Sequence, residues 1–315
     1  MTGAAAPADV GRKARAARVS IASNSALIVL KLVAGAATGS IAIVTEAVHS
    51  SIDLLASFVA YFSVRKAGEP ADDDHMYGHE KVENLASALE GILILVGAGI
   101  IIFESVRRLN HPQDIESLGF GIAAIGISMV VNLVVSTYLS REARATDSPA
   151  LEGDAAHLWT DALTSGGVLA ALALVAITGE QAIDPITALV VATVIVWSGI
   201  RIVNRSSRVL VDEALPADEL AQVGEAVAGS GTREVLGFHK LRARRAGSRR
   251  YIDMHVQFAP GTTLERAHHL SHELQGEIER RIPHADVLIH LEPGSSPPGA
   301  DPGSGDSPRG TPSEG

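Results

Sequence analysis

The stretch LASALEGILILVGAGIIIF, from Leu85 to Phe103, decides the fold class. Glu90 is its one charged residue, and the others are apolar or small. An α-helix needs about 20 such residues to cross the hydrocarbon core of a bilayer, so the stretch predicts a membrane-spanning helix. Because a carboxylate is costly inside a membrane, Glu90 is a candidate for neutralising a cation or relaying a proton.

Five more apolar stretches lie on either side of this one. The composition agrees with a membrane protein, since 46% of the 315 residues are hydrophobic but only 4% are aromatic, which is an aliphatic bias. We therefore expect a membrane all-α six-helix bundle. The other predicted spans are Val19–Ala37, Ile41–Val64, Leu118–Leu139, Ala162–Ile177 and Ile186–Ile202.

The basic residues predict how the chain crosses the membrane. They precede the first span and follow the second, fourth and sixth, as Arg15, Arg65 and Arg141 illustrate. Since loops rich in Lys and Arg stay in the cytoplasm, we expect a multi-pass protein of the cell membrane with both termini cytoplasmic. Arg107 and Arg108 are the exception, because this topology places them outside.

The ends of the chain and the soluble part complete the predicted organisation. The basic, Ala-rich start resembles a signal peptide, but the apolar stretch after it is too long for one. The tail is rich in Gly, Pro and Ser and is expected to be disordered. The predicted domains are a cytoplasmic segment (1–17), a six-span domain (18–208), a cytoplasmic domain (209–293) and the tail (294–315).

The cytoplasmic domain shows the pattern of a small α+β unit. Its apolar periodicity switches between helical and alternating, in the order αββαβ, which is expected to bury one sheet face under two helices and to give a metallochaperone-like fold. The predicted elements are a helix at Asp218–Ala228, strands at Gly237–Arg244 and Arg250–Phe258, a helix at Leu264–Arg281 and a strand at Asp286–Leu291.

Charge and cysteine content exclude several kinds of function. There are 26 basic and 36 acidic side chains, a formal net charge of −10, without a long basic tract, so nucleic acid is not an expected partner. The chain has 0 cysteines, which excludes disulfides, Fe–S clusters and thiolate metal sites. Any metal must therefore be held by His, Asp and Glu.

A segment that occurs twice in the sequence contains the candidate metal ligands. The segment EAVHSSIDLLAS, which starts at Glu46, recurs as DAAHLWTDALTS from Asp154. Each copy contains His-x-x-x-Asp, and residues four apart lie on the same face of a helix. Two such helices facing each other offer four ligands of the kinds that suit tetrahedral Zn²⁺, namely His49, Asp53, His157 and Asp161. Helix-packing hydrogen bonds are the alternative, but intramembrane ionisable groups favour a functional role.

With these motifs, six spans and an αββαβ tail, the chain resembles the cation diffusion facilitator family of metal/proton antiporters, over roughly residues 17–293. The resemblance implies a homodimer in the lipid bilayer, with the transport site on the second and fifth spans. It implies efflux of a divalent transition metal from the cytoplasm, with protons as counter-ion. His at the first position of both motifs resembles zinc-preferring members.

The resemblance also implies further metal sites outside the bilayer. The loop after the second span resembles the family's interhelical loop, in which an Asp and two His bind a metal ion. A solvated acidic connector is the alternative for this loop. In the tail domain, comparable positions bind regulatory zinc at the dimer interface, and Glu292 stands where some relatives carry Asp. The implied ligands are Asp72, His75 and His79 in the loop and His239, His255, His268, His290 and Glu292 in the tail domain.

Lys81 and Asp212 match positions that form an interprotomer salt bridge in that family, near the hinge between the membrane and soluble parts.

Two other functions compete with transport. A membrane metalloenzyme is disfavoured, because the sequence has no His-Glu-x-x-His motif and four protein ligands leave no position for a substrate water. A membrane metal sensor is disfavoured because it gives intramembrane ligands no purpose. We therefore expect a secondary active transporter and no enzyme.

Overall fold

The computed structural model describes residues 7–38, 41–110, 119–180 and 182–294. Within the helices, a few side chains, including that of His49, also lie outside the described part. The chain divides into two compact units. The first unit is Met1–Glu213 with Arg244–Arg249, and the second is Ala214–Ala243 with Arg250–Gly315. Of the predicted disordered tail, only Gly294 belongs to the described residues.

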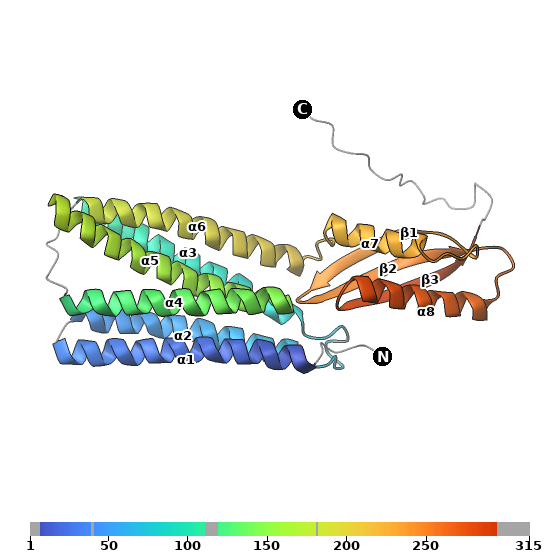
Figure 1. The fold of residues 1–315 in the computed structure, drawn as a ribbon, viewed down its shortest axis with the longest axis horizontal. Helices are drawn as coiled ribbons and strands as arrows, with labels where there is room; N and C mark the ends of the chain where they lie inside the picture. The colour runs from blue at the N-terminus through green and yellow to red at the C-terminus, as the bar shows by residue number, and fades with distance from the viewer. Residues whose placement is uncertain (1–6, 39–40, 111–118, 181, 295–315) are drawn as a thin grey trace, which may run out of the picture. The chain divides into compact units, whose positions relative to one another are not determined.

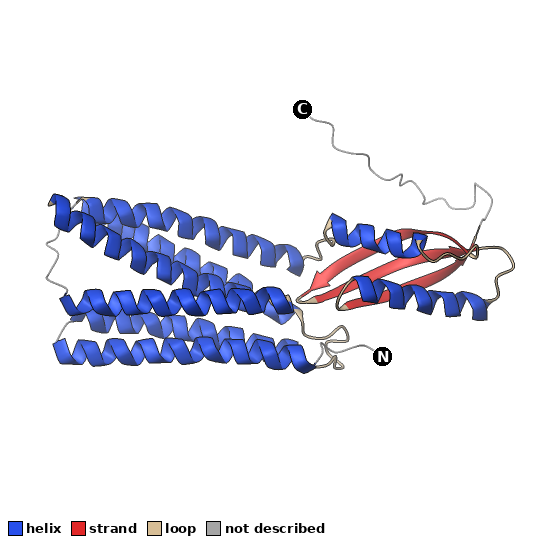
Figure 2. Cartoon of the chain, viewed as in Figure 1, coloured by secondary structure: helices blue, strands red, loops and turns tan. Residues whose placement is uncertain are grey.

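The first unit is a bundle of long helices that lie side by side (Figure 1; Figure 2). Each helix has about the length that a membrane crossing requires or more. The helices are α1 (Pro7–Thr38), α2 (Ile41–Ala67), α3 (Lys81–Asn110), α4 (Gly119–Thr146), α5 (Pro149–Thr178) and α6 (Ile183–Leu210).

Five of these helices are long and apolar enough to cross a membrane, which agrees with the prediction of a helical membrane domain. They contain the spans Asp9–Val33, Lys81–Asn110, Ile122–Thr146, Pro149–Thr178 and Ile183–Leu210. This count holds for the described residues, and the side chains of α2 before Ser50 are outside them. The crossing by α2 therefore stays a prediction.

The fifth span is longer than predicted, and the difference matters for the site. Its apolar run begins at Ala162, but the helix begins at Pro149, with Ser148 as its N-cap accepting from the backbone N–H of Leu151. Proline suits the first turn of a helix and serine suits the cap, so these two residues set the start. The polar residues between Pro149 and Ala162 are thus helical, and most of them face the interior of the bundle.

Small residues let α3 and α6 approach closely. A Cβ at Gly91 would lie 2.8 Å from Cγ2 of Val203 and 3.1 Å from its backbone nitrogen. A Cβ at Gly199 would lie 2.8 Å from Cγ of Leu95. Such glycines are typical of membrane helix contacts, where packing replaces the hydrophobic effect.

The second unit has the predicted αββαβ order. Its three strands form a sheet in the order β1-β2-β3. A two-residue turn joins β1 to β2. Helix α8 connects β2 to β3, and these two strands pair in parallel. The elements are α7 (Ala217–Ala228), β1 (Val235–Ala246), β2 (Arg249–Phe258), α8 (Leu264–Arg281) and β3 (Ala285–Pro293).

Alternation along β2 assigns one face of this sheet to the core. Ile252, Met254 and Val256 are buried and belong to one cluster with buried residues of α7 and α8. Residues between them, such as His255, point to the opposite face because side chains alternate along a strand. The histidines of the sheet therefore gather on the face that the helices leave open.

Candidate metal centres

Asp53 of α2 meets His157 and Asp161 of α5 inside the helical unit. Each residue offers one ligand atom, and these atoms lie within 4.8 Å of one another. Nε2 of His157 is 3.2 Å from Oδ1 of Asp53 and 3.8 Å from Oδ2 of Asp161. Tetrahedral zinc ligands are about 3.3 Å apart, so small side-chain shifts suffice to hold one ion.

The fourth predicted ligand, His49, has a side chain outside the described residues. Its backbone lies in α2, one helical turn before Asp53. Residues four apart share a helix face, so the backbone position of His49 is on the same face of α2 as that of Asp53. Its participation stays a prediction.

A buried polar group that sequence reasoning missed lies one turn from His157 on α5. Asp154 is 0% exposed, and its Oδ1 accepts a hydrogen bond from the hydroxyl of Ser57 at 3.3 Å. Ser57 also contacts Ser20 at 2.9 Å and accepts from Asn24 at 2.8 Å, both on α1. Asp154 opens the second copy of the repeated segment, and that position was the available signal.

Three carboxylate oxygens near this site are buried without a hydrogen-bond partner among the described residues. Neither carboxylate oxygen of Glu90 has one, nor does Oδ2 of Asp154. Nδ1 of His157 is also buried without a partner. Buried polar atoms are usually paired, so such a concentration among the described residues is unusual.

The loop between α2 and α3 brings together Asp72, His75 and His79. Oδ1 of Asp72 accepts from the backbone N–H of His75 at 2.7 Å, and this hydrogen bond lowers the pKa of the Asp72 carboxyl. The rings of His75 and His79 are 4.5 Å apart. His79 is buried, and its Nε2 lies 3.2 Å from Oδ2 of Asp72, yet neither ring nitrogen makes a hydrogen bond among the described residues. This donor set fits a metal ion.

In the second unit, Glu292 lies between two histidines. Nε2 of His239 is 2.6 Å from Oε2, and Nδ1 of His255 is 2.5 Å from Oε1. The hydrogen bond with His255, followed by that with His239, lowers the pKa of the Glu292 carboxyl. His290 pairs with His255 in the β-sheet register, and their rings are 4.5 Å apart. Four of the five predicted residues therefore meet on the open sheet face.

His268 stands apart from that group within one chain. Its Nε2 is 3.2 Å from Nε2 of His272, one turn along α8. The two rings meet edge to face, with centroids 4.4 Å apart. The ligand role of His268 stays a prediction.

Lys81 and Asp212 are paired within one chain. Nζ of Lys81 is 2.8 Å from Oδ1 of Asp212, and Nη1 of Arg244, from the segment that groups with the helical unit, is 2.9 Å from the same oxygen. Hydrogen bonds from Lys81 and then Arg244 lower the pKa of the Asp212 carboxyl. Asp212 also has a positive φ of 61° just after α6, so the two cations hold a strained turn.

Comparisons with known proteins agree with this architecture. The model of the cation efflux transmembrane domain matches residues 17–211, and that of the cytoplasmic domain of cation efflux proteins matches residues 215–294. The Synechocystis sp. protein called Uncharacterized transporter sll1263 is 35% identical over 279 residues, covering 89% of this chain and 90% of that protein. Cation-efflux pump FieF of Serratia proteamaculans is 33% identical over 283 residues, covering 90% and 93%. A protein of the same name from Yersinia pestis gives the same identity and coverage.

Proposed function

This chain belongs to the cation efflux family, and from that premise we propose that it exports a divalent transition metal, zinc in particular, from the cytoplasm in exchange for protons. Membership makes it a multi-pass membrane transporter of cations rather than an enzyme. Zinc, the proton exchange and the ligand roles are the proposed part. The observation that carries the proposal is the meeting of Asp53, His157 and Asp161 on two helices of the bundle.

The ligand chemistry favours zinc. Carboxylate oxygen and imidazole nitrogen together suit Zn²⁺, which has no d-electron preference against tetrahedral geometry. The chain has no cysteine, so a soft thiolate site is excluded. His49 completes the set in this proposal, since it shares a helix face with Asp53.

Exchange with protons follows from the nature of imidazole. Only the neutral ring binds a metal, and free imidazole changes charge near physiological pH. In the proposed cycle, the metal displaces protons from His49 and His157 on the cytoplasmic side. After the helices move, protons from the other side displace the metal. Asp154 and Glu90, which are buried nearby, are proposed to carry protons or balance charge during this exchange.

The sites outside the bilayer are proposed to regulate transport. Asp72, His75 and His79 can hold an ion beside the start of α3. His239, His255, His290 and Glu292, with His268 of a second copy, are proposed to bind zinc and draw two cytoplasmic domains together in a homodimer. The family match of residues 215–294 supports this placement of the dimer contact.

Transport by purified protein in proteoliposomes tests the main proposal. Asp53→Asn removes one ligand charge with little change in shape, and zinc flux is expected to fall ~10-fold or more. Asp184→Asn is the matched control, because Asp184 lies at the start of α6 and contacts Arg108 instead of the cluster. Flux by Asp53→Asn equal to that of the control would reject the site.

Transport of a panel of divalent metals, measured under an imposed pH gradient, tests the exchange of metal for protons. Efflux of zinc from the cytoplasmic side should rise when the opposite side is made acidic. It should fall when an ionophore collapses the gradient. A flux that ignores the gradient in wild-type protein contradicts proton coupling but leaves the metal site standing.

A further inference from the structure

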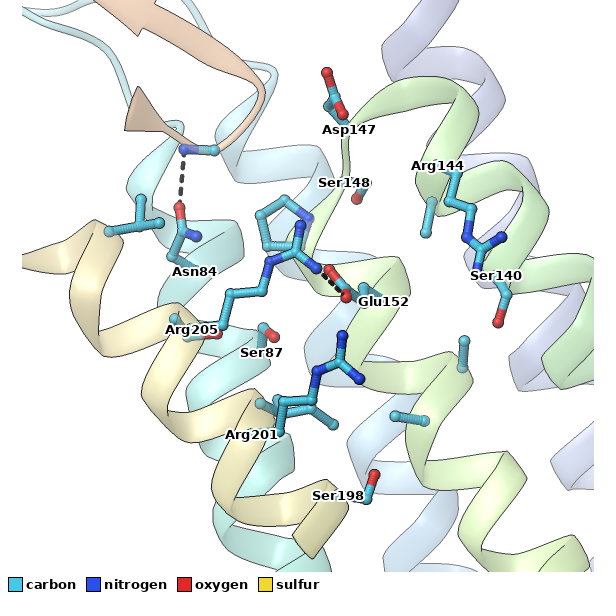
Figure 3. A pocket seen from close by; sticks show the side chains of 18 of the residues that line it. Asn84, Ser87, Ser140, Arg144, Asp147, Ser148, Glu152, Ser198, Arg201 and Arg205 are labelled. Atoms are coloured by element: carbon cyan, nitrogen blue, oxygen red, sulfur yellow. Dashed lines mark hydrogen bonds and ion pairs between the residues drawn. The ribbon is translucent and has the colours of Figure 1, made fainter. Parts of the chain in front are cut away.

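A cavity of about 600 Å³ lies within the helical unit (Figure 3). It is formed by the start of α3, the end of α4, the start of α5 and the end of α6. The basic residues predict this end of the bundle to be cytoplasmic. Its volume is in the range of small-ligand sites.

The lining of this cavity is rich in arginine. Figure 3 shows Arg201 and Arg205 on α6 and Arg144 on α4, with Glu152 of α5 between them. Arg205 forms an ion pair with Glu152. Arg245, from the segment that groups with this unit, also lines the cavity.

The remaining charges leave a positive excess. Nη2 of Arg245 is 3.9 Å from Oδ1 of Asp147, the second lining carboxylate. Among the described residues, neither Arg144 nor Arg201 has a carboxylate partner. Two guanidinium groups therefore border the cavity without a counter-charge, and they suit a phosphate, which guanidinium binds through paired hydrogen bonds.

The start of α5 adds to this preference for an anion. Ser148 and Pro149 line the cavity, and they are the N-cap and first residue of α5. The N-terminus of a helix carries a partial positive charge and favours phosphate groups. The arginines and the helix start therefore act in the same direction.

An aromatic and aliphatic surface beside the cavity indicates that the anion belongs to a lipid. Trp197 lines the cavity, is 63% exposed, and has Cζ of Arg201 5.5 Å from its ring centre. Exposed Ile186, Val190 and Val194 lie at helical spacing before it on α6. Tryptophan is enriched where headgroups meet hydrocarbon, and the aliphatic stripe is suited to acyl chains.

The same lining argues against a path for the transported metal. An excess of arginine repels a divalent cation. Asp53, His157 and Asp161 are not among the residues that line the cavity. The three cluster residues are therefore not part of this cavity, although Ala156 and Trp159 of its lining lie on either side of His157 along α5.

We propose that this cavity is a binding site for the phosphate headgroup of an anionic phospholipid, with Arg144 and Arg201 as the principal ligands and Trp197 at the headgroup boundary. Basic pockets between membrane helices on the cytoplasmic side are suited to such headgroups. The site concerns the lipid partner of the bundle and does not depend on which metal is transported.

Native mass spectrometry of the full chain in detergent tests the proposal. The protein is incubated with phosphatidylglycerol or with phosphatidylcholine, and bound lipids are counted. Arg144→Gln with Arg201→Gln should weaken phosphatidylglycerol binding ~10-fold or more and leave phosphatidylcholine unchanged. The matched control removes the same charge as Arg107→Gln with Arg108→Gln, two exposed arginines in the last turn of α3.

Four outcomes overturn the site. Equal phosphatidylglycerol binding by the cavity variant and the wild type removes the arginines as ligands. Equal loss in the control variant shows only a general attraction of charge. If millimolar inorganic phosphate displaces the lipid and itself stays bound, the cavity is a site for a free anion. The same spectra report the oligomeric state, and a change in dimer content without a change in lipid assigns the surface to a second copy.

Discussion

Lys13 of α1 and Glu83 of α3 form a buried ion pair within the helical unit. Substitutions in this pair test how the helices pack. Nζ of Lys13 is 2.8 Å from Oε1 of Glu83, and each side chain is only 4% exposed. The hydroxyl of Ser148 donates to the other carboxylate oxygen. Replacing Lys13 with Met leaves a buried carboxylate without its counter-charge, which costs about 3–5 kcal/mol.

The magnitude can be converted to a melting temperature. For a unit of 150–250 residues, roughly 2–4 °C is lost per kcal/mol, so Lys13→Met should lower Tm by roughly 6–20 °C. Adding Glu83→Gln to the same protein removes the stranded charge while the hydrogen bond from Ser148 can remain. The double variant should recover most of the loss, because replacing both partners of a buried pair is often close to neutral.

Intrinsic tryptophan fluorescence is a suitable assay. The chain has 2 tryptophans, Trp159 and Trp197, and both lie in the helical unit, so the signal reports the part that contains the pair. Heating the purified protein in one detergent compares the wild type, the single variants and the double variant. A loss below about 2 °C in Lys13→Met, or a double variant as unstable as the single one, would refute the buried pair.

Three other predictions concern packing, pH and metal. Gly91→Ala should be less stable than Gly97→Ala by about 1–3 kcal/mol, because a Cβ meets the backbone of Val203 only at position 91; equal melting temperatures contradict this. The cationic partners of Asp212 lower its pKa, so its stabilising effect is present above the ordinary Asp range near 4 and is lost as the pH falls through the folded value. Melting between pH 5 and 3 should accordingly depend less on pH in Asp212→Asn, and an unchanged slope counts against the pairing. Glu292→Gln should weaken zinc binding to the cytoplasmic cluster ~10-fold or more by equilibrium dialysis, and unchanged affinity would exclude Glu292 as a ligand.

Periodicity and residue type predicted most of the fold. The αββαβ order follows from local signals, such as the alternation in β2 and the Thr263 cap of α8, whose hydroxyl accepts from the N–H of Arg266. The start of α5 was predicted too late because hydropathy falls where a helix carries His157 and Asp161, while the backbone continues to be helical. A hydropathy window measures polarity, and the polar residues here belong to the interior of the bundle.

In the candidate site, contacts within one helix could be predicted from the sequence, whereas contacts between elements could not. The spacing of His157 and Asp161 places them on one helix face, and this could be predicted from the sequence. His268 and His272 are also four apart on one helix, but their separation from the cluster at Glu292 could not be predicted, because it depends on how α8 packs on the sheet. The pairing of Arg244 with Asp212 likewise depends on a contact between segments far apart in the chain.

The unpaired atoms around His157 bear on the proposed exchange of metal and protons. Nδ1 of His157, Oδ2 of Asp154 and both carboxylate oxygens of Glu90 are buried without hydrogen-bond partners among the described residues. A structural polar network would have its partners in place, as the Lys13–Glu83 pair does. In the proposed exchange, cations and protons are the partners of these groups, since both are ligands that carboxylate and imidazole accept.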